Sequence, residues 1–245
     1  MSRLRVPVSD LHPGRLELCT RAAHYVVHVH RLGVGDAFVV FDPQARVEAD
    51  ASLVEVGRGH LVCEIGVVRP ATLVAQREAW LVQGIAKHDT LDQIVRDATE
   101  LGVSHIVPGV CRRANTSGAH ISPHRMRRWI RIAEEAARQC GRGDLPNLEP
   151  QQALLDGLRR VPERALKLCL CAQAQTPACK VMQSSEIVDA VAVLVGPEGG
   201  LDSSEVDLAL DAGFVPVSLG PYVLRVETAA TAILGALLAW HCPGV

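Results

Sequence analysis

Two glycine-bearing segments near the C-terminus carry the residues best suited to hold a small ligand. Residues 196–200 read Gly-Pro-Glu-Gly-Gly and residues 219–221 read Leu-Gly-Pro, after apolar runs at 190–195 and 215–219 that are typical of strands. Glycine lets the backbone approach a ligand closely, and neighbouring parallel strands would bring both segments to one carboxyl edge, where open α/β folds bind ligands. The pattern indicates a nucleotide-like ligand. Tight turns between strands and helices are the alternative.

Familiar phosphate-binding and dinucleotide-binding loops are missing from the sequence. No segment reads Gly-x-x-x-x-Gly-Lys-Ser/Thr, and neither residues 33–35 nor residues 57–59 continue into Gly-x-Gly-x-x-Gly between a strand and a helix. The sequence therefore argues against P-loop enzymes and ordinary Rossmann dehydrogenases.

The cysteines and histidines do not form a recognisable metal-binding pattern. The eight cysteines include no Cys-x-x-Cys pair, and Cys169 and Cys171 stand two apart in a strand-like run at 166–171, where both side chains would pack on one face. No cysteine or carboxylate stands at ligand spacing from three nearby histidines, His24, His28 and His30. We predict reduced thiols and no metal.

Positive charge is concentrated in one part of the chain. Between Arg112 and Arg142 there are eight arginines against two acids, so this window carries +6, which leaves −8 for the rest of a chain whose net charge is −2. A charged helix face in water is the ordinary explanation of such a run, but the arginines at 112 and 113 just before the predicted helix favour contact with phosphates.

The elements that must position these residues fall into two parts. Short β-favouring runs at 37–41, 47–56 and 61–68 are separated by turn residues, which predicts a small all-β barrel in the first part. After Pro70, strands alternate with helices, which predicts a parallel sheet covered by helices. The predicted fold class is therefore α/β with a separate β-rich N-terminal part.

Several helix ends have local signals. Thr90 with Gln93 resembles a capping box before a helix at 91–101, and Gly102 suits a left-handed C-terminal cap. Ser122 before Pro123 predicts the start of the arginine-rich helix, which should run to about Cys140. Further helices are expected after the cap formed by Asp202 with Glu205 and at 227–240.

Length and hydropathy restrict the class of protein further. With 245 residues, 48% of them hydrophobic, the chain can bury a substantial core. The sequence offers no signal-peptide run at its N-terminus and no uninterrupted apolar stretch of about 18 residues that would span a membrane. We expect a cytoplasmic protein without membrane contact.

Two segments resemble the signature of the 16S ribosomal RNA uracil-N3 methyltransferases, a branch of the SPOUT class. They are residues 196–200 and residues 219–229, which read Leu-Gly-Pro-x-x-Leu-Arg-x-Glu-Thr-Ala. The resemblance covers nearly the whole chain and includes residues 31–36, 86–87, 100–103 and 139–142, Asp92, Pro108, Arg113 and Pro146. The chain departs from the usual family pattern at Tyr222, Val226 and Arg138.

This resemblance implies a PUA-like β-barrel that binds RNA over residues 1–72 and a SPOUT methyltransferase domain with a trefoil knot over residues 73–245, in a homodimer. From the residues alone no knot would be expected, because threaded chains are rare. The implied cofactor is S-adenosylmethionine, and the residues expected to hold it are Leu194, Gly196, Pro197, Glu198, Gly199, Gly200, Leu219, Gly220, Pro221 and Leu224.

The implied reaction also assigns roles to charged residues. Uracil N3 becomes a nucleophile only when its proton leaves, so the enzyme must align the attack and stabilise an anion. Arg225 is the candidate anion stabiliser, and Glu227 would accept the proton or hold Arg225. A structural bridge between the two is the alternative. Contacts to RNA, in 16S ribosomal RNA or the small ribosomal subunit, are expected from Arg31, Lys87, Arg112, Arg113, Arg128 and Arg142.

Two other functions remain open at this point. A SPOUT enzyme acting on another RNA, such as a transfer RNA, would carry the same cofactor motifs. A non-catalytic RNA-binding factor in ribosome assembly would keep the fold, although the intact residues 196–200, Arg225 and Glu227 speak against it.

Overall fold

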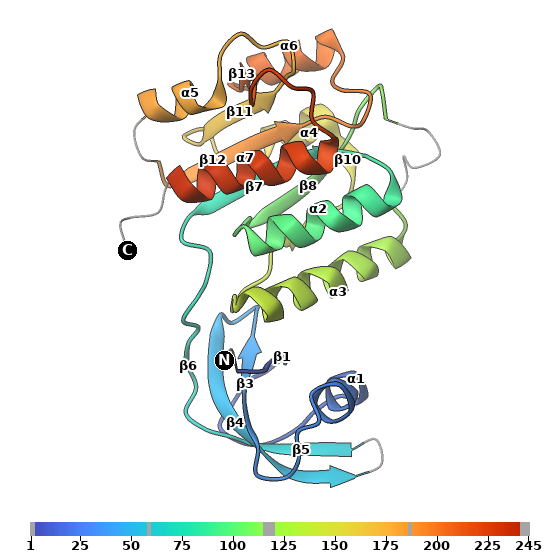
Figure 1. Ribbon diagram of the computed structural model, residues 1–245, viewed down its shortest axis with the longest axis vertical. Helices are drawn as coiled ribbons and strands as arrows, with labels where there is room; N and C mark the ends of the chain where they lie inside the picture. The colour runs from blue at the N-terminus through green and yellow to red at the C-terminus, as the bar shows by residue number, and fades with distance from the viewer. Residues whose placement is uncertain (1–2, 58–59, 115–120, 186–187, 241–245) are drawn as a thin grey trace. The chain divides into compact units, whose positions relative to one another are not determined.

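The chain folds into two compact units, which are described separately (Figure 1). A computed structural model describes residues 3–57, 60–114, 121–185 and 188–240. The first unit comprises Met1–Val74 with Glu134–Leu145, and the second comprises Ala75–Ala133 with Pro146–Val245. The segment at 134–145 therefore belongs to the first unit although it lies far from it in sequence, which the predicted division at residue 72 did not anticipate.

The first unit is built on one six-stranded sheet in the order β1, β3, β4, β5, β2, with β6 paired to β4. Its strands are β1 Arg5–Pro7, β2 Gly14–Glu17, β3 Ala37–Asp42, β4 Val47–Gly57, β5 His60–Ile65 and β6 Arg69–Pro70. The predicted strands at 37–41, 47–56 and 61–68 correspond to β3, β4 and the stretch from β5 towards β6. Of the turn residues at 57–59 that separate the second and third of these runs, residues 58–59 lie outside the described residues.

The core of the first unit follows from the strand period of two. In β5, Leu61, Cys63 and Ile65 alternate with more exposed residues and join Phe38 and Val40 of β3 in one hydrophobic cluster. Among the described residues, the two end strands β1 and β2 do not pair with each other, so the sheet is open rather than a closed barrel.

The first unit is not all-β, and that part of the prediction was wrong. A short α-helix, α1 Thr20–His24, continues directly into a π-helical turn, Tyr25–Val29. Ala23 and Val26 are buried in the same core as the strands. Burial of one apolar face holds this segment helical, since tertiary packing routinely outweighs local propensity. Arg138, one of the departures from the family pattern, stacks on the Tyr25 ring at 4.2 Å.

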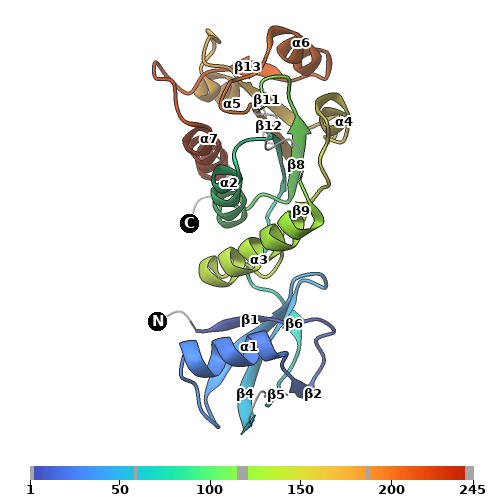
Figure 2. The same cartoon turned by 90° about the vertical axis from the view of Figure 1, so that its right-hand side faces the viewer.

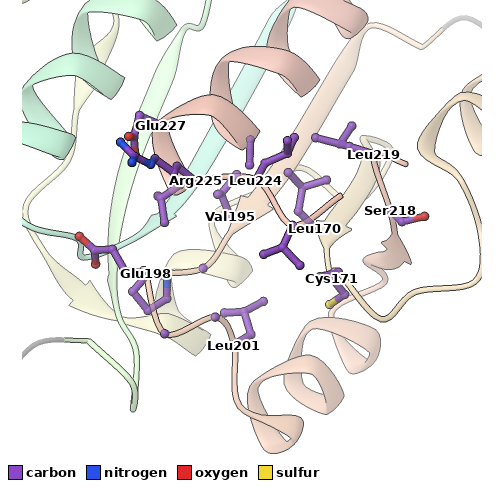
Figure 3. Close-up of a pocket in the computed structure, with 18 of the residues that line it drawn as sticks. Leu170, Cys171, Val195, Glu198, Leu201, Ser218, Leu219, Leu224, Arg225 and Glu227 are labelled. Carbon is purple, nitrogen blue, oxygen red and sulfur yellow. The ribbon is translucent and has the colours of Figure 1, made fainter. Parts of the chain in front are cut away.

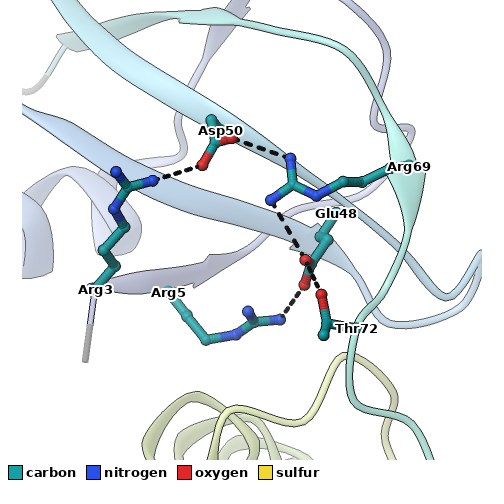
Figure 4. Close-up of polar contacts among 6 residues, drawn as sticks. All are labelled: Arg3, Arg5, Glu48, Asp50, Arg69 and Thr72. Carbon is teal, nitrogen blue, oxygen red and sulfur yellow. Dashed lines mark hydrogen bonds and ion pairs between the residues drawn. The ribbon is translucent and has the colours of Figure 1, made fainter. Parts of the chain in front are cut away.

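A network of charged side chains lies along β4 (Figure 4). The buried Glu48 accepts hydrogen bonds from Arg5 at 2.9 Å and Thr72 at 2.7 Å, and the more exposed Asp50 pairs with Arg3 and Arg69 at 3.0 and 3.1 Å. Burial by itself would raise the pKa of Glu48, but the hydrogen bonds from Thr72 and Arg5 outweigh it and lower the pKa below its ordinary value. The network links Arg3, Arg5 and Thr72 to the side chains of β4.

The second unit contains a seven-stranded, entirely parallel sheet in the order β10, β8, β7, β12, β11, β13, with β9 paired to β8. Its strands are β7 Glu78–Gly84, β8 His105–Val110, β9 Asn147–Leu148, β10 Gln152–Ala153, β11 Leu166–Leu170, β12 Ala190–Val195 and β13 Val215–Val217. All six residues of β12 are buried, as predicted for a central strand covered on both faces.

Helices cover the two faces of this sheet (Figure 2). Figure 2 shows α2 and α7, which contact each other, on one face and α4 on the other. The helices of this unit are α2 His88–Glu100, α4 Leu154–Arg159, α5 Ala178–Ser184, α6 Ser203–Asp211 and α7 Val226–Trp240. Helix α3 Pro123–Cys140 begins in this unit, and its residues from Glu134 belong to the first unit. The α/β class with a parallel sheet, predicted from the sequence, is confirmed. In the part of the chain that the structure describes, none of the helices combines the length and apolarity needed to cross a bilayer.

Three of the local capping signals were correct. Ser122 Oγ accepts the Arg125 N–H at the start of α3, Gly102 has the left-handed φ of 81° after α2, and Asp202 with Glu205 forms a capping box on α6. Two predictions were wrong. Helix α2 begins at His88 rather than after Thr90, and β13 pairs with β11 rather than with β12.

Candidate active site

The second unit contains a pocket of about 690 Å³ at the carboxyl edge of its sheet (Figure 3). Its walls come from the segments that follow β11, β12 and β13 and from the start of α7. This volume is typical of sites that hold small molecules, and the edge is where open parallel sheets bind ligands. The two glycine segments therefore reach one pocket, although β11 separates their strands in the sheet.

Residues 196–201, which we call the anchored segment, pack tightly against the strands beside them. An ideal Cβ added at Gly84 of β7 would lie 2.7 Å from Pro197, and one at Gly196 would lie 3.0 Å from Leu201. The buried amide of Gln83 donates to the carbonyl oxygens of Val195 and Gly196 at 3.4 and 3.3 Å. Close backbone packing, rather than turn formation alone, accounts for these glycines.

Acidic side chains in the anchored segment and shortly after it bind backbone N–H groups. Glu198 accepts the N–H of Lys87 at 2.8 Å, which caps α2 from a residue far along the chain. The buried Glu205 accepts the N–H of Asp202 and the N–H of Arg112, both at 2.7 Å. These charge-assisted bonds join the anchored segment to α2, and join the start of α6, which follows it, to the residues after β8.

The arginine pair after β8 also contacts the anchored segment. Arg113 donates to the carbonyl oxygen of Gly199 at 3.4 Å and lies 3.6 Å from the Asp202 carboxylate, while Arg112 reaches the same carboxylate at 4.0 Å. Hydrogen bonds from Ser204, together with burial that acts in the opposite direction and the two arginines, leave the pKa of Asp202 below its ordinary value. The predicted RNA contacts Arg112 and Arg113 therefore lie beside the pocket.

Residues 219–225, which we call the open segment, form a much more exposed wall. Tyr222 and Val223 are 80% and 84% exposed. Backbone bonds hold the approach to the segment, with Ser218 donating to the carbonyl oxygen of Thr176 at 2.9 Å. Gly220 has a φ of 132°, which favours glycine. This wall is accessible from solvent and carries Arg225 at its end.

Arg225 and Glu227 both line the pocket. Arg225 is exposed and Glu227 is partly buried, and no ion pair joins them or links either to another of the described residues. A structural bridge between the two, the alternative raised by the sequence, is therefore not present. The guanidinium and the carboxylate are available to a bound molecule.

Most of the residues predicted for the cofactor lie on the pocket wall. Gly196, Pro197, Glu198, Gly199, Gly200, Leu219, Gly220 and Leu224 line it. Leu194 is fully buried in the core beneath, and Pro221 is not among the lining residues. Sequence reasoning missed the third wall, which follows β11 and includes Leu170 and Cys171. The strand-like run at 166–171 was the available signal, but only the strand order places it here.

The predicted RNA-contacting residues are placed unequally. In the second unit, Lys87 and Arg113 line the pocket, and Arg128 is largely exposed while it donates to Asp92 at 2.6 Å. Arg31, in the first unit, is exposed. Arg142 contradicts the prediction, since its side chain is only 6% exposed and pairs with Asp144 at 2.7 Å. A guanidinium buried against a carboxylate cannot reach a phosphate. No cluster of three or more potential metal ligands occurs among the described residues.

Comparison with known proteins agrees with the fold and the pocket. Residues 75–238 match the family described as RNA methyltransferase domain, so the second unit is an RNA methyltransferase domain. The chain is 30% identical over 218 residues to ribosomal RNA small subunit methyltransferase E of Mycobacterium tuberculosis, covering 85% of this chain and 80% of that one. It is 29% identical over 240 residues to the Synechocystis enzyme, covering 97% and 77%.

Solved structures are similar over the whole chain. Ribosomal RNA small subunit methyltransferase E from Neisseria gonorrhoeae bound to S-adenosyl methionine has a TM-score of 0.86 at 26% identity and covers 97% of each chain. A Legionella pneumophila methyltransferase with the bound cofactor SAM has a TM-score of 0.87 at 30% identity and covers 98% of each. The chain belongs to the ribosomal RNA small subunit methyltransferase E family.

Proposed function

We propose that this chain transfers the methyl group of S-adenosylmethionine to N3 of a uridine in 16S ribosomal RNA. The observation that carries the proposal is the single pocket that both glycine segments, Arg225 and Glu227 line together. Membership of the family supports the reaction, and relatives solved with this cofactor support the ligand.

The pocket suits the cofactor on physical grounds. Apolar side chains of Leu170, Leu201, Leu219 and Leu224 offer a surface for a purine ring, and the backbone of the anchored segment offers hydrogen-bonding groups. At Gly200 and Gly220 an added Cβ would meet nothing within 4 Å, so both positions border open space. When bound, the cofactor supplies an electrophilic methyl group attached to a positively charged sulfur.

Arg225 and Glu227 would perform the chemistry on the base. Loss of the N3 proton leaves negative charge that the uracil shares between N3 and its two carbonyl oxygens. A guanidinium can donate to two acceptors at once, so Arg225 would stabilise this anion, and the Glu227 carboxylate would accept the proton. With N3 deprotonated and its charge stabilised by these two residues, the base would be ready to take the methyl group that a bound cofactor would supply.

Contact with RNA would come from exposed cations in both units. We propose Lys87, Arg112, Arg113 and Arg128 in the second unit and Arg31 in the first, and we withdraw Arg142 because it is buried. Each phosphate contact should contribute about 0.7–0.9 to the slope of log affinity against log salt. An affinity that does not change with salt would contradict these contacts.

The proposal extends to the architecture of the two units. We propose that the first unit is a PUA-like RNA-binding domain, and that the second is a SPOUT domain whose chain threads a trefoil knot and pairs into a homodimer. Membership of the family supports this architecture. Light scattering of the purified protein would test the dimer.

Methyl transfer to defined RNAs tests the proposal directly. Small subunits and 16S RNA from a strain that lacks this protein would be incubated with radiolabelled cofactor, digested to nucleosides and analysed by mass spectrometry. We expect 3-methyluridine at one position, and complementation of the strain should restore it. Methylation of transfer RNA alone would mean that transfer RNA, rather than 16S ribosomal RNA, is the substrate. Binding of RNA without methyl transfer or cofactor binding would favour an assembly factor.

A further inference from the structure

The pocket wall that sequence reasoning missed contains two thiols that methyl transfer does not use. Cys171 lines the pocket and is partly buried, whereas Cys169 is fully buried beneath it. Their Sγ atoms are 3.7 Å apart. Figure 3 shows Cys171 among the side chains that surround the cavity.

The strand fixes this proximity. Cys169 lies in β11, which pairs with β12 on one side and β13 on the other, so its position is set by two neighbours. Cys171 follows two residues later and therefore points to the same face, and its N–H donates to the carbonyl oxygen of Val217 at 2.9 Å. The pair belongs to the framework of the sheet rather than to a loose loop.

The two thiols differ in acidity. The hydrogen bond to Cys171, followed by burial, raises the pKa of Cys169, and the same hydrogen bond lowers the pKa of Cys171. Cys171, at the pocket wall, is thus the thiol that ionises more easily, with a buried S–H donor beside it. Since the thiolate is the nucleophile, reaction would begin at Cys171.

We propose that Cys169 and Cys171 form a redox-active dithiol site in the pocket wall, which takes hydroperoxides as its substrate and closes to an intramolecular disulfide. The Cys171 thiolate attacks one peroxide oxygen, the O–O bond breaks, and Cys171 becomes a sulfenic acid as the other oxygen leaves as water. The Cys169 sulfur then forms the S–S bond as the S–O bond breaks and a second water leaves. Two thiols are oxidised and one hydrogen peroxide is reduced to two waters.

Closure of this disulfide should disturb the pocket. The sulfur atoms must approach from 3.7 Å to about 2.05 Å, which pulls residue 171 towards β11 and strains its bond to Val217 at the edge of the next wall. A bridge across one intervening residue is strained and hence easily reduced again. This consequence for the cofactor rests on the proposed function, whereas the thiol chemistry does not.

The test uses the full-length protein with Cys179→Ser. Trypsin releases residues 168–180 as one peptide, which also contains the exposed Cys179, so this substitution leaves only the two thiols of interest in it. After treatment with hydrogen peroxide, we expect this peptide to lose the mass of two hydrogens and to regain it with dithiothreitol. Bound S-adenosylhomocysteine should slow the reaction. The oxidised protein should bind S-adenosylhomocysteine about tenfold more weakly, the size of one lost hydrogen bond.

Matched variants separate the roles of the two sulfurs. With Cys169→Ser in the same background, Cys171 should proceed to a sulfinic acid, and with Cys171→Ser the buried Cys169 should remain unmodified. The proposal is overturned if the parent peptide gains oxygen at Cys171 without losing two hydrogens, or if bound S-adenosylhomocysteine does not slow closure. If calorimetry detects no binding of S-adenosylhomocysteine to the reduced protein, the proposed function is wrong. The peptide masses expected for the dithiol are the same in that case.

Discussion

The anchored segment and the open segment carry similar glycine motifs but are held very differently. The anchored segment is fixed by Gln83, by the contact of Gly84 with Pro197, and by the bonds of Glu198 and Glu205 to other parts of the unit. The open segment exposes Tyr222 and Val223 almost fully. Similar motifs in sequence can therefore produce one rigid wall and one accessible wall.

This difference suggests that the two segments have different functions, cofactor binding for the anchored segment and delivery of Arg225 to the base for the open segment. A rigid wall can bind a small cofactor without losing further conformational freedom, which favours affinity. An exposed wall can deliver Arg225 to a base that arrives on a large RNA, where some adjustment is needed. Changes in the anchored segment should therefore affect cofactor binding, and changes in the open segment should affect turnover.

Arg225→Ala should produce the largest effect. Removing the guanidinium takes away the donor aimed at the uracil anion, so we expect turnover to fall by about 10²–10³-fold. Affinity for S-adenosylhomocysteine, measured by calorimetry, should stay within about twofold because the backbone of the anchored segment is untouched. Retained turnover would exclude Arg225 from the mechanism and contradict the different functions proposed for the two segments.

Gly84→Ala should damage the anchored segment through packing. The new methyl group would lie 2.7 Å from Pro197, and we expect the free energy of unfolding to drop by about 1–3 kcal/mol, with weaker cofactor binding. Gly235→Ala in α7 is the control, because an added Cβ there meets nothing and alanine should stabilise the helix by about 0.5–1 kcal/mol. Urea unfolding measures both. Equal stability of the two variants would contradict the tight packing of Gly84 against Pro197.

Glu205→Gln should weaken the junction between the anchored segment and the arginine pair. A side-chain amide cannot accept both the Asp202 and the Arg112 N–H groups through charged oxygens, so we expect a loss of about 1.5–3 kcal/mol in stability. Affinity for S-adenosylhomocysteine should fall as well. The exposed Glu163→Gln serves as the matched control and should change stability by less than about 0.5 kcal/mol. Equal free energies of unfolding for the two variants would show that the junction contributes nothing to stability.

Tyr222→Ala should have the smallest effect on the cofactor. Its side chain is 80% exposed, so affinity for S-adenosylhomocysteine should change by less than about twofold. Light scattering would be recorded in parallel to compare the oligomeric state of the variant with that of the parent protein, because Tyr222 is an exposed aromatic residue beside the pocket. A large loss of cofactor affinity would mean that the open segment is as firmly organised as the anchored one.

Much of the fold could be predicted because its signals are local. The cap formed by Asp202 with Glu205 and the start of α3 at Ser122 depend on residues two or three positions apart, and the period of two in β5 reports a buried face directly. The site motifs were equally local, so the sequence identified their residues although it did not give their arrangement in space. The local pair Thr90 and Gln93 failed, because α2 already begins at His88; the N–H of the preceding Lys87 is bound by Glu198, far along the chain, which no local pattern reveals.

The sequence by itself determined several of the strands and helices, and which glycines and charged residues are available for a ligand, since these follow from backbone preferences and short-range spacing. Only the tertiary structure decided that β11 lies between β12 and β13, that Cys171 joins the pocket wall, and that Arg142 is buried against Asp144. Strand order and burial depend on which apolar faces pack together across the whole chain, and no local pattern encodes that choice.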